Sequence, residues 1–449
     1  MSHFSSGVKA PQVRRPPNPF PNFRFKPAAY KPGPFVIGAA IDHFFVLFND
    51  NSSAEDEVRE LAENLTDFGK KKGLAIPKPT VIPMNIKDAE EFFEVLNGDE
   101  KNFVLYVDTK EDGSSHDLLK LYERKYSVPT QHINAGFKLH EHKMISLLTV
   151  KINLKCGGRN RDFEYCSIPD DTLVMAIQMI VPQKCNNREI DLSTPNVVAF
   201  SFNGLKEKSD FIGDYAFEAN GVPSIQNLHI YVKNMLKVFQ KNRGRLPENI
   251  VFIRSCICDS QQKKVLLDIE VPLIRDACQQ FSPDYSPKLN VIHFENKKKF
   301  KVQQLIESHK RDRFLYVKGP MAPPRIAQIA LLKEQQIGQS VFCACSVILN
   351  EVDSFFKTAT SIAPWEPLAV IVSEMCDIAQ NSLEARSCPE PVHQAAELGD
   401  RGKRMIEAFK RENRMSDYWS GTEQQYDWLT ITGKLALSGT VFAEKQIVC

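Results

Sequence analysis

The sequence predicts an α/β protein in which strands and helices alternate along the chain. Short apolar runs rich in β-branched and aromatic residues, such as 102–108 (NFVLYVD) and 249–257 (NIVFIRSCI), have the length and composition of buried strands. Longer stretches between such runs have the composition and end signals of helices. The chain has 449 residues, of which 43% are hydrophobic. A chain of this size can form two or three packed cores.

The N-terminal segment, residues 1–34, is rich in proline and aromatic residues. Proline lacks a backbone donor and fixes φ, so this composition does not support a regular helix. We expect a linker or arm that lies against a folded domain.

Residues 35–160 predict a first layered α/β domain. An apolar run at 35–48 is followed by a helix at 53–73, with Ser53 suited to its start and Gly73 to its end. The strand at 102–108 and a helix at 115–127 continue the alternation. A further strand-like run carries Lys151 and Lys155 and ends at a glycine pair.

Residues 161–449 predict a second α/β domain with the same alternation. Its expected strands are 196–204, 249–257 and 288–295, and its expected helices are 224–242, 261–281 and 395–413. The final residues are apolar, which indicates a C-terminal segment packed against the domain.

Charge and cysteine content exclude several classes of protein. Lysine and arginine number 57 against 55 acidic residues, so a net charge of +2 provides no overall field that would attract nucleic acid. Any anion site must therefore be local. No apolar run has the roughly 20 residues of a membrane span, and there is no secretory leader pattern. The 11 cysteines lack zinc-ligand spacing and are expected to be reduced.

One group of residues suits phosphate binding. His116 and Lys120 are four residues apart and share one face of a predicted helix. Gln131 begins the next element, and Lys151 and Lys155 follow. If these residues meet, three ammonium groups, an amide and an imidazole form one small pocket. Charge-assisted hydrogen bonds from such groups favour a phosphate.

The segments that carry this group, 116–133 (HDLLKLYERKYSVPTQHI) and 147–160 (LLTVKINLKCGGRN), resemble the phosphate pocket of the MID domain of Argonaute proteins. The resemblance implies a Rossmann-like layered α/β domain that holds the 5′ end of a small guide RNA. Histidine at the position where many animal Argonautes have tyrosine resembles the worm-specific (WAGO) branch. His116 would then stack on the first base. The glycine pair would be the turn by which the pocket-bearing strand leaves the domain.

Three later segments, beginning at residues 196, 249 and 389, resemble motifs of the PIWI domain in order, so the resemblance covers about residues 35 to 449. It implies a ribonuclease H-like mixed sheet with flanking helices. In that fold, four carboxylate-type ligands hold two metal ions that activate water against an RNA phosphate. Here their positions are expected at Asn203, Ser255, Ala396 and Pro223, none of which replaces a carboxylate. Nearby Asp259 and Glu397 would point elsewhere.

The resemblance also implies contacts along the guide backbone. These fall on Lys297, Lys301 and Arg401, although lysine runs are commonly solvated surface. Trp365 falls in a loop that reaches nucleic acid or effector peptides in the family, but a core or capping role suits it as well. The N-terminal and PAZ domains of a full-length Argonaute are expected to be absent.

The leading hypothesis is a non-cleaving, guide-binding protein of RNA-mediated silencing. Its expected partners are a small RNA with a 5′ phosphate or triphosphate, a base-paired target RNA and silencing effector proteins. We expect a monomer without membrane association, located in the cytoplasm, the nucleus or RNA granules. No cofactor or catalytic metal is expected, and a Mg²⁺ ion accompanying the 5′ phosphate is the one metal left open.

Two alternatives belong to other classes. The first is a degenerate PIWI lobe that acts as a scaffold or decoy for silencing-pathway proteins without RNA. The second is an active ribonuclease that uses non-standard metal ligands.

Overall fold

A computed structural model describes most of the chain. The described residues are 33–49, 55–99, 101–108, 114–134, 141–163, 166–182, 193–221, 224–255, 264–294, 314–316, 327–334, 340–351, 366–382, 386–412, 415–420 and 425–447.

The smaller domain is built on a parallel sheet with the described strand order β2-β1-β3-β4. Its strands are β1 (His43–Phe48), β2 (Pro79–Pro83), β3 (Asn102–Asp108) and β4 (Thr130–Asn134). Its helices are α1 (Glu55–Lys71), the 3₁₀ turn η1 (Ile86–Asp88), α2 (Glu90–Val95), α3 (Ser114–Tyr126) and α4 (His142–Lys155).

Two cores cover the two faces of this sheet. Every residue of β3 is buried, as expected for a central strand of a parallel sheet. Helices α1 and α4 share a core with Val46 and Leu105 on one face. Helices α2 and α3 share a second core with Leu47 and Tyr106 on the other. This alternation of side chains along the strands produces the layered domain.

The larger domain is built on a mixed sheet with the described order β10-β11-β12-β9-β8-β5-β6-β7. Strand β5 is parallel to β8 and antiparallel to β6. The strands are β5 (Thr172–Ile180), β6 (Asn196–Phe202), β7 (Ile212–Glu218), β8 (Asn249–Ser255), β9 (Lys288–Phe294), β10 (Phe314–Tyr316), β11 (Ala327–Glu334) and β12 (Ser340–Asn350).

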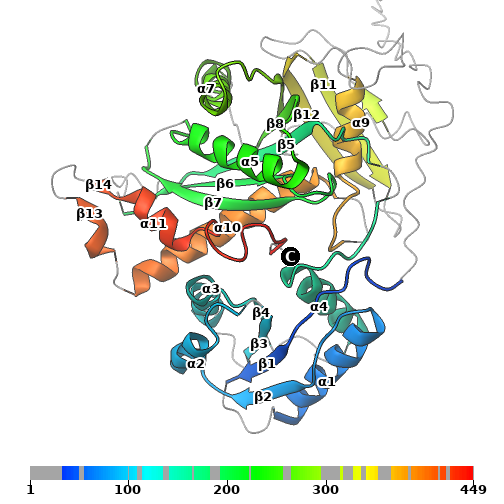
Figure 1. The fold of residues 1–449 in the computed structure, drawn as a ribbon, viewed down its shortest axis with the longest axis vertical. Coiled ribbons are helices and arrows are strands. Elements are labelled where there is room, and N and C mark those ends of the chain that lie inside the picture. The colour runs from blue at the N-terminus through cyan, green and yellow to red at the C-terminus, as the bar shows by residue number, and fades with distance from the viewer. Residues whose placement is uncertain are drawn as a thin grey trace, which may run out of the picture.

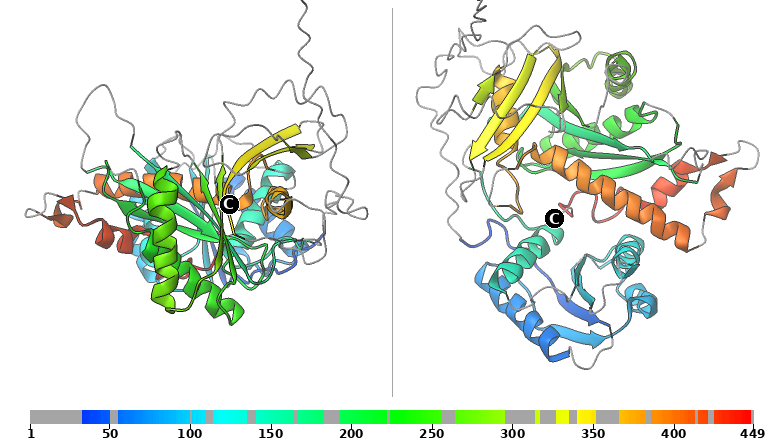
Figure 2. Two further views of the ribbon diagram at one scale, coloured as in Figure 1. Left: turned by 90° about the horizontal axis from the view of Figure 1, so that it is seen from above. Right: turned by 180° about the vertical axis from the view of Figure 1, so that it is seen from behind.

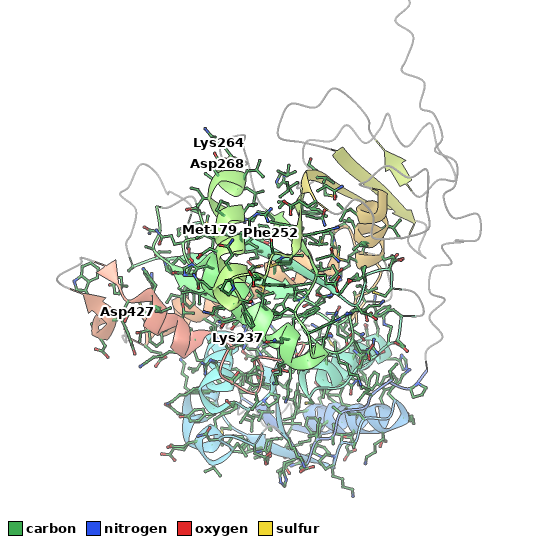
Figure 3. The ribbon with its side chains drawn as sticks, turned by 45° about the horizontal axis from the view of Figure 1, so that its top comes forward. Met179, Lys237, Phe252, Lys264, Asp268 and Asp427 are labelled. Carbon is green, nitrogen blue, oxygen red and sulfur yellow. The ribbon has the colours of Figure 1, made fainter. Side chains whose placement is uncertain are left out.

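Helices cover both faces of this sheet. One face packs on α5 (Leu228–Arg243) and α7 (Val271–Phe281), which follows a π-helical turn, η2 (Leu266–Glu270). The other face packs on α9 (Glu366–Met375), α10 (Glu390–Arg411) and α11 (Trp428–Leu435). A small ribbon of β13 (Trp419–Ser420) and β14 (Gln425–Tyr426), preceded by η4 (Ser416–Tyr418), lies near α11. Figure 3 shows Phe252 inside this body and Lys264 and Asp268 at its edge.

Helix α10 lies against the larger sheet on the side that faces the smaller domain (Figures 1 and 2). Two glycines permit its close approach. A Cβ atom at Gly399 would lie 2.6 Å from Ile180 Cδ1, and one at Gly402 would lie 2.7 Å from Val197 Cγ1. Both distances are shorter than a normal van der Waals contact. Glycine, which has no Cβ atom, therefore lets the helix pack this close to β5 and β6 without displacing Ile180 or Val197.

The two domains contact each other through α3, α10 and the C-terminal segment, which runs between them in Figure 1. Arg124 of α3 donates to the carbonyls of Gly433, at 2.9 Å, and Ala436. Buried Asp214 of β7 accepts from the backbone N–H groups of Leu437 and Ser438, both at 2.7 Å. These bonds fix the C-terminal segment against both domains, as its apolar composition predicted.

The structure confirms most expected elements and corrects one. Strand β3 has the predicted bounds, and Gly73 follows α1 with a φ of 91°. The run that carries Lys151 and Lys155 is the C-terminal part of helix α4, not a strand. The expected turn after it is present, because Gly157 has a φ of 86°, in the region that glycine favours.

Several predictions fall outside the described residues and stay predictions: residues 1–32, Pro223, Asp259, Lys297, Lys301 and Trp365. Within the described part, the six cysteines whose state can be read are all free thiols, as expected.

Candidate anion-binding site

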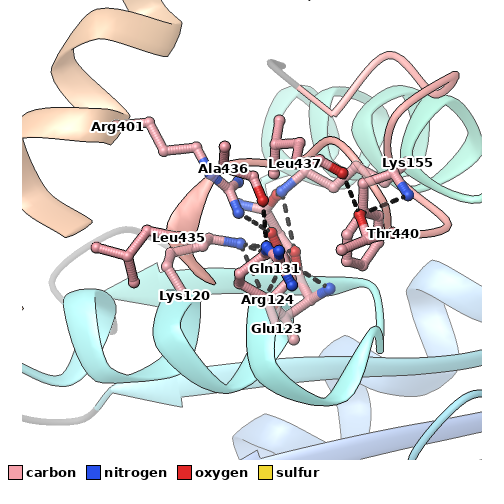
Figure 4. A network of polar contacts seen from close by, with 12 residues as sticks. Lys120, Glu123, Arg124, Gln131, Lys155, Arg401, Leu435, Ala436, Leu437 and Thr440 are labelled. Atoms are coloured by element: carbon pink, nitrogen blue, oxygen red, sulfur yellow. Dashed lines mark hydrogen bonds and ion pairs between the residues drawn. The ribbon is translucent and has the colours of Figure 1, made fainter. Parts of the chain in front are cut away.

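A buried polar cluster lies where the two domains meet, and Figure 4 shows Lys120, Glu123 and Arg401 in it. Thr130 is at its centre, because it bonds Lys120, Glu123 and Lys155. Thr130 is the first residue of β4 and is completely buried. The ammonium group of Lys120, on α3, donates to the Thr130 carbonyl at 3.0 Å and to the Thr130 hydroxyl at 2.8 Å. A third hydrogen bond of 2.7 Å joins Lys120 to Glu123. Helix α3 therefore supplies a lysine that is held on three sides.

A second lysine reaches the same carbonyl from α4. Lys155 Nζ donates to the Thr130 carbonyl at 2.9 Å and to Gln131 Oε1 at 2.8 Å. Gln131 in turn donates from Nε2 to the His132 carbonyl at 2.9 Å, which fixes its amide. Only 7% of Lys120 and 5% of Lys155 is exposed. Two ammonium groups thus share one carbonyl oxygen in a nearly dry environment.

The larger domain contributes a third cation. Arg401 Nη2, on α10, donates to Glu123 Oε1 at 2.7 Å across the domain boundary. The other carboxylate oxygen, Oε2, accepts from Lys120 and, at 2.9 Å, from the Thr130 backbone N–H. The Thr130 hydroxyl also donates to this oxygen. Glu123 therefore joins the cations of both domains.

The cluster contains three cations and one anion. Burial opposes ionisation of Glu123, but Lys120 and Arg401 outweigh it and hold the pKa of this carboxyl well below its usual range. Burial lowers the pKa of Lys120, and neighbouring Lys155 and Arg401 act in the same direction, opposed by Glu123. With all four groups charged, the cluster has an excess of two positive charges. Such an excess in a low-dielectric site attracts an anion.

Two histidines lie beside the cluster: His116 is one turn before Lys120 on α3, and His132 is on β4. His116 is four residues before Lys120, its side chain is 31% exposed, and its Nδ1 lies 3.3 Å from Asp117 Oδ1. Its ring is edge-on to that of His132, with centroids 5.4 Å apart. Burial lowers the pKa of both rings, that of His132 to about 4. His116 is therefore a neutral, partly exposed flat ring beside the cluster at neutral pH.

The structure brings together Lys120, Gln131, Lys155 and Arg401. Lys151 is half-buried one turn before Lys155, on the same side of α4. Thr130 and Glu123 belong to the cluster but were not predicted from the sequence. Glu123 could have been found from its i, i+3 spacing to Lys120, although this spacing is also common on solvated helices.

The expected metal positions of the larger domain do not all meet. Ser255 ends β8, and its Oγ lies 3.5 Å from Gln178 Oε1 near the end of β5. Asn203 instead bonds the backbone at the beginning of β5, accepting from Val174 N–H at 2.8 Å and donating to the Thr172 carbonyl. Six residues of strand, about 20 Å, separate Thr172 from Gln178.

The expectation for Asn203 was therefore wrong, because it cannot share a site with Ser255. The residue next to Ser255 is Gln178, whose neutral amide is also unlike a carboxylate. Ala396 lies on α10, two residues after Gln394 and three before Gly399. Gln394 accepts from the Ser201 hydroxyl at 3.0 Å, and Gly399 packs closely on β5. Glu397 is exposed. Among the described residues, no group of three or more His, Cys, Asp or Glu side chains could hold a metal ion.

A parallel-sheet domain and a mixed-sheet domain, joined across a buried cationic cluster, define this protein as a two-domain α/β protein with a cationic cluster at its domain interface. Residues 102–407, more than half of the chain, match the family model described as Piwi domain. The chain therefore belongs to the Piwi domain family, and the match covers the larger sheet together with β3 and β4 of the smaller one.

Curated relatives are Argonaute proteins. The chain is 21% identical over 361 residues to Argonaute protein wago-1 of Caenorhabditis elegans, covering 77% of this chain and 37% of that protein. It is 24% identical over 245 residues to Argonaute protein wago-4 of the same organism, covering 51% and 25%. The chain thus spans well under half the length of these relatives. The resemblance to Argonautes, and to the WAGO branch among them, is confirmed.

Solved structures confirm the fold class. The C-terminal lobe of a budding yeast Argonaute superposes with a TM-score of 0.67 at 17% identity, covering 85% of this chain and 82% of that one. Kluyveromyces polysporus Argonaute with a guide RNA gives a TM-score of 0.66 at 18% identity, covering 85% and 48%. The crystal structure of the N. crassa QDE-2 AGO MID-PIWI domains gives a TM-score of 0.58 at 17% identity, covering 88% of this chain and 95% of that one. In the described part of the chain, no helix has the length and apolar character needed to cross a membrane.

Proposed function

We propose that this protein binds the 5′ end of a small guide RNA at the cluster around Thr130 and holds the RNA for pairing with a target transcript. The convergence of Lys120, Lys155 and Arg401, from three helices and two domains, is the observation that supports this function. A 5′ monophosphate has about two negative charges, which matches the excess positive charge of the cluster when all four of its groups are charged.

The groups around the cluster suit a nucleotide end more than a free anion. His116 offers a flat neutral ring for stacking on the first base, and Gln131 offers an amide for its polar edge. The likeness to Argonaute lobes, one solved with a guide RNA, supports RNA as the ligand. A guide held in this way would present its bases to a target RNA.

We propose further that the protein does not cleave the target. Gln178 and Ser255 meet near the ends of neighbouring strands, where metal-binding carboxylates would be required, and neither provides a negative charge. Ala396, on α10, provides none either. Silencing would then depend on effector proteins that the monomeric complex recruits in the cytoplasm, the nucleus or RNA granules. A Mg²⁺ ion could accompany the phosphate without a protein carboxylate.

The test compares one short RNA with a 5′ hydroxyl, a 5′ monophosphate or a 5′ triphosphate by fluorescence anisotropy at fixed, physiological salt. The proposed function requires tighter binding of the phosphorylated ends. Equal affinity for all three ends would refute it.

A second candidate function is a scaffold that binds silencing-pathway proteins without RNA. One observation favours it: Glu123 bonds Lys120 and Arg401, so these two cations have an anionic partner within the chain and do not require a ligand for one. Protein purified from cells without nucleic-acid absorbance, together with intact partner binding, would support this alternative. Co-purified small RNA would exclude it.

A further inference from the structure

Lys120 has no donor left for a ligand. An ammonium group has three N–H donors. In Lys120 they are directed to Glu123 Oε2, the Thr130 carbonyl and the Thr130 hydroxyl, at 2.7, 3.0 and 2.8 Å. A phosphate can bond this lysine only if one of these bonds is broken. Of the three, the bond to Glu123 is the charged one.

Glu123 occupies the position of an anion within the cluster. It is 1% exposed, and its two oxygens accept from Lys120, Arg401 and the N–H and hydroxyl of Thr130. Two cations, a hydroxyl and a backbone amide are also the groups that bind a phosphate oxygen elsewhere in proteins. The carboxylate thus occupies donors that an incoming phosphate would use.

Other donors of the cluster remain available. Lys155 uses two of its three N–H groups, and Gln131 Nε2 uses one of its two. The Nε atom of Arg401 is buried and has no hydrogen-bond partner among the described residues. A phosphate can therefore bind beside Glu123, but only in its electric field.

We propose that Glu123 is an internal competitor: its carboxylate competes with the 5′ phosphate for the donors of the cluster and so sets the affinity of the cluster for the phosphate. This inference rests on the proposed function. In the free protein the carboxylate stabilises Lys120 and Arg401. In the complex it repels the phosphate, or it must withdraw so that these two cations turn to the ligand. Glu123 is thus a specificity-determining residue that lowers affinity for phosphorylated ends without affecting RNA that lacks them.

The test measures binding of 5′-monophosphate and 5′-hydroxyl RNA to the full chain and to three variants. Glu123→Gln keeps the shape and removes the charge. Glu123→Asp keeps the charge but is one methylene too short to reach all its partners. Glu91→Gln, at an exposed position of α2, is the matched control. Cooperative thermal unfolding of each variant shows that it is folded.

Removing one unit charge within several ångströms of the ligand changes affinity by about 10- to 100-fold at an effective dielectric constant of about 20. We expect this gain for monophosphate RNA with Glu123→Gln, a smaller gain with Glu123→Asp, and none with Glu91→Gln. Binding of 5′-hydroxyl RNA should change by less than about threefold, because that end places no phosphate against the carboxylate.

The outcomes separate the two proposals. If the wild-type protein prefers the monophosphate and Glu123→Gln binds it equally or more weakly, the competitor role is wrong and the proposed function stands. If neither protein distinguishes the two ends, the proposed function fails, and this inference fails with it. If Glu123→Gln does not fold, Glu123→Asp decides alone: a gain supports the competitor, and no gain overturns it.

Discussion

Replacing Lys155 with methionine is the most direct test of phosphate binding at the cluster around Thr130. Methionine has a similar length and apolar stem but no charge and no donor. The variant loses the bonds to the Thr130 carbonyl and to Gln131 Oε1. The Thr130 carbonyl keeps its bond of 3.0 Å from Lys120, so it does not become an unpaired buried acceptor. The local structure should therefore persist.

The expected loss of RNA affinity follows from the remaining donor of Lys155. A hydrogen bond to a charged group contributes about 1.5–3 kcal/mol, which corresponds to about 10- to 150-fold in affinity for the phosphorylated RNA. The lost bonds are charge-assisted, but their loss is offset because one buried charge is removed and the neighbouring Lys120 is relieved of repulsion. We expect a change within about 1 kcal/mol in the free energy of unfolding.

The assay is fluorescence anisotropy of 5′-monophosphate and 5′-hydroxyl RNA over a range of salt concentrations. One lost phosphate contact should also reduce the slope of log affinity against log salt by about 0.7 for single-stranded RNA. Lys101→Met is the control, since Lys101 is 59% exposed and pairs with Asp42, outside the cluster.

Unchanged affinity of folded Lys155→Met for the phosphorylated RNA would refute the assignment of this lysine to the phosphate. An equal loss for both RNA ends would also refute it, because a general loss indicates backbone attraction and not recognition of the end. A large fall in stability would show that the role of Lys155 is structural.

Three further predictions concern cleavage, stability and pH. With a guide–target duplex and Mg²⁺ or Mn²⁺ we expect no cleavage, because Gln178 and Ser255 are not carboxylates; product that disappears with EDTA would contradict this. Glu270→Ala removes the carboxylate that lies 3.0 Å from Arg254 and leaves this buried guanidinium without its charged partner. The free energy of unfolding, measured by urea titration, should fall by about 3–5 kcal/mol. A loss below about 1 kcal/mol would show that the pair is dispensable. Burial lowers the pKa of His132 to about 4, so between about pH 6.5 and 4 the unfolded chain binds a proton that the folded chain does not. Stability should therefore fall with decreasing pH across this window, by up to about 1.4 kcal/mol per pH unit, and His132→Gln should reduce the slope of the thermal unfolding data.

Local sequence signals predicted the elements whose neighbours reinforce them. Strand β3 has the residues of a buried parallel strand over all seven positions, and α1 begins with acidic residues and ends in lysines before Gly73. In these segments intrinsic propensity, hydrophobic pattern and end signals agree. The boundaries followed from the residues themselves.

Helix α4 could not be predicted in this way. Its run from Thr149 to Ile152 contains three β-branched residues among four, and its buried residues do not form one narrow stripe. A helix that is buried over much of its surface lacks the periodic pattern that distinguishes helix from strand. Packing against α1, which the sequence does not display, decides the outcome.

The roles of Asn203 and Glu123 depend on contacts between distant segments. The topology of the mixed sheet decides which strand lies next to β8. That strand is β5, but the adjacent antiparallel strand β6 is a similarly buried, apolar run, so composition does not distinguish the two. Asn203 was therefore placed one strand away from the residue that meets Ser255. Glu123 resembles an ordinary surface glutamate until Arg401, 278 positions later, is brought to it.

If a 5′ phosphate binds at the cluster as proposed, the ion pair between Glu123 and Arg401 links its binding thermodynamically to the mutual orientation of the domains. A ligand that draws both Lys155 and Arg401 toward itself binds best when the domains are in one arrangement, and it stabilises that arrangement by the same free energy. The linkage operates in both directions. A partner protein that binds the outer face of α10 and changes its orientation relative to α3 would weaken binding of the RNA end without contacting the RNA. An RNA end in place would resist such a protein by an equal amount.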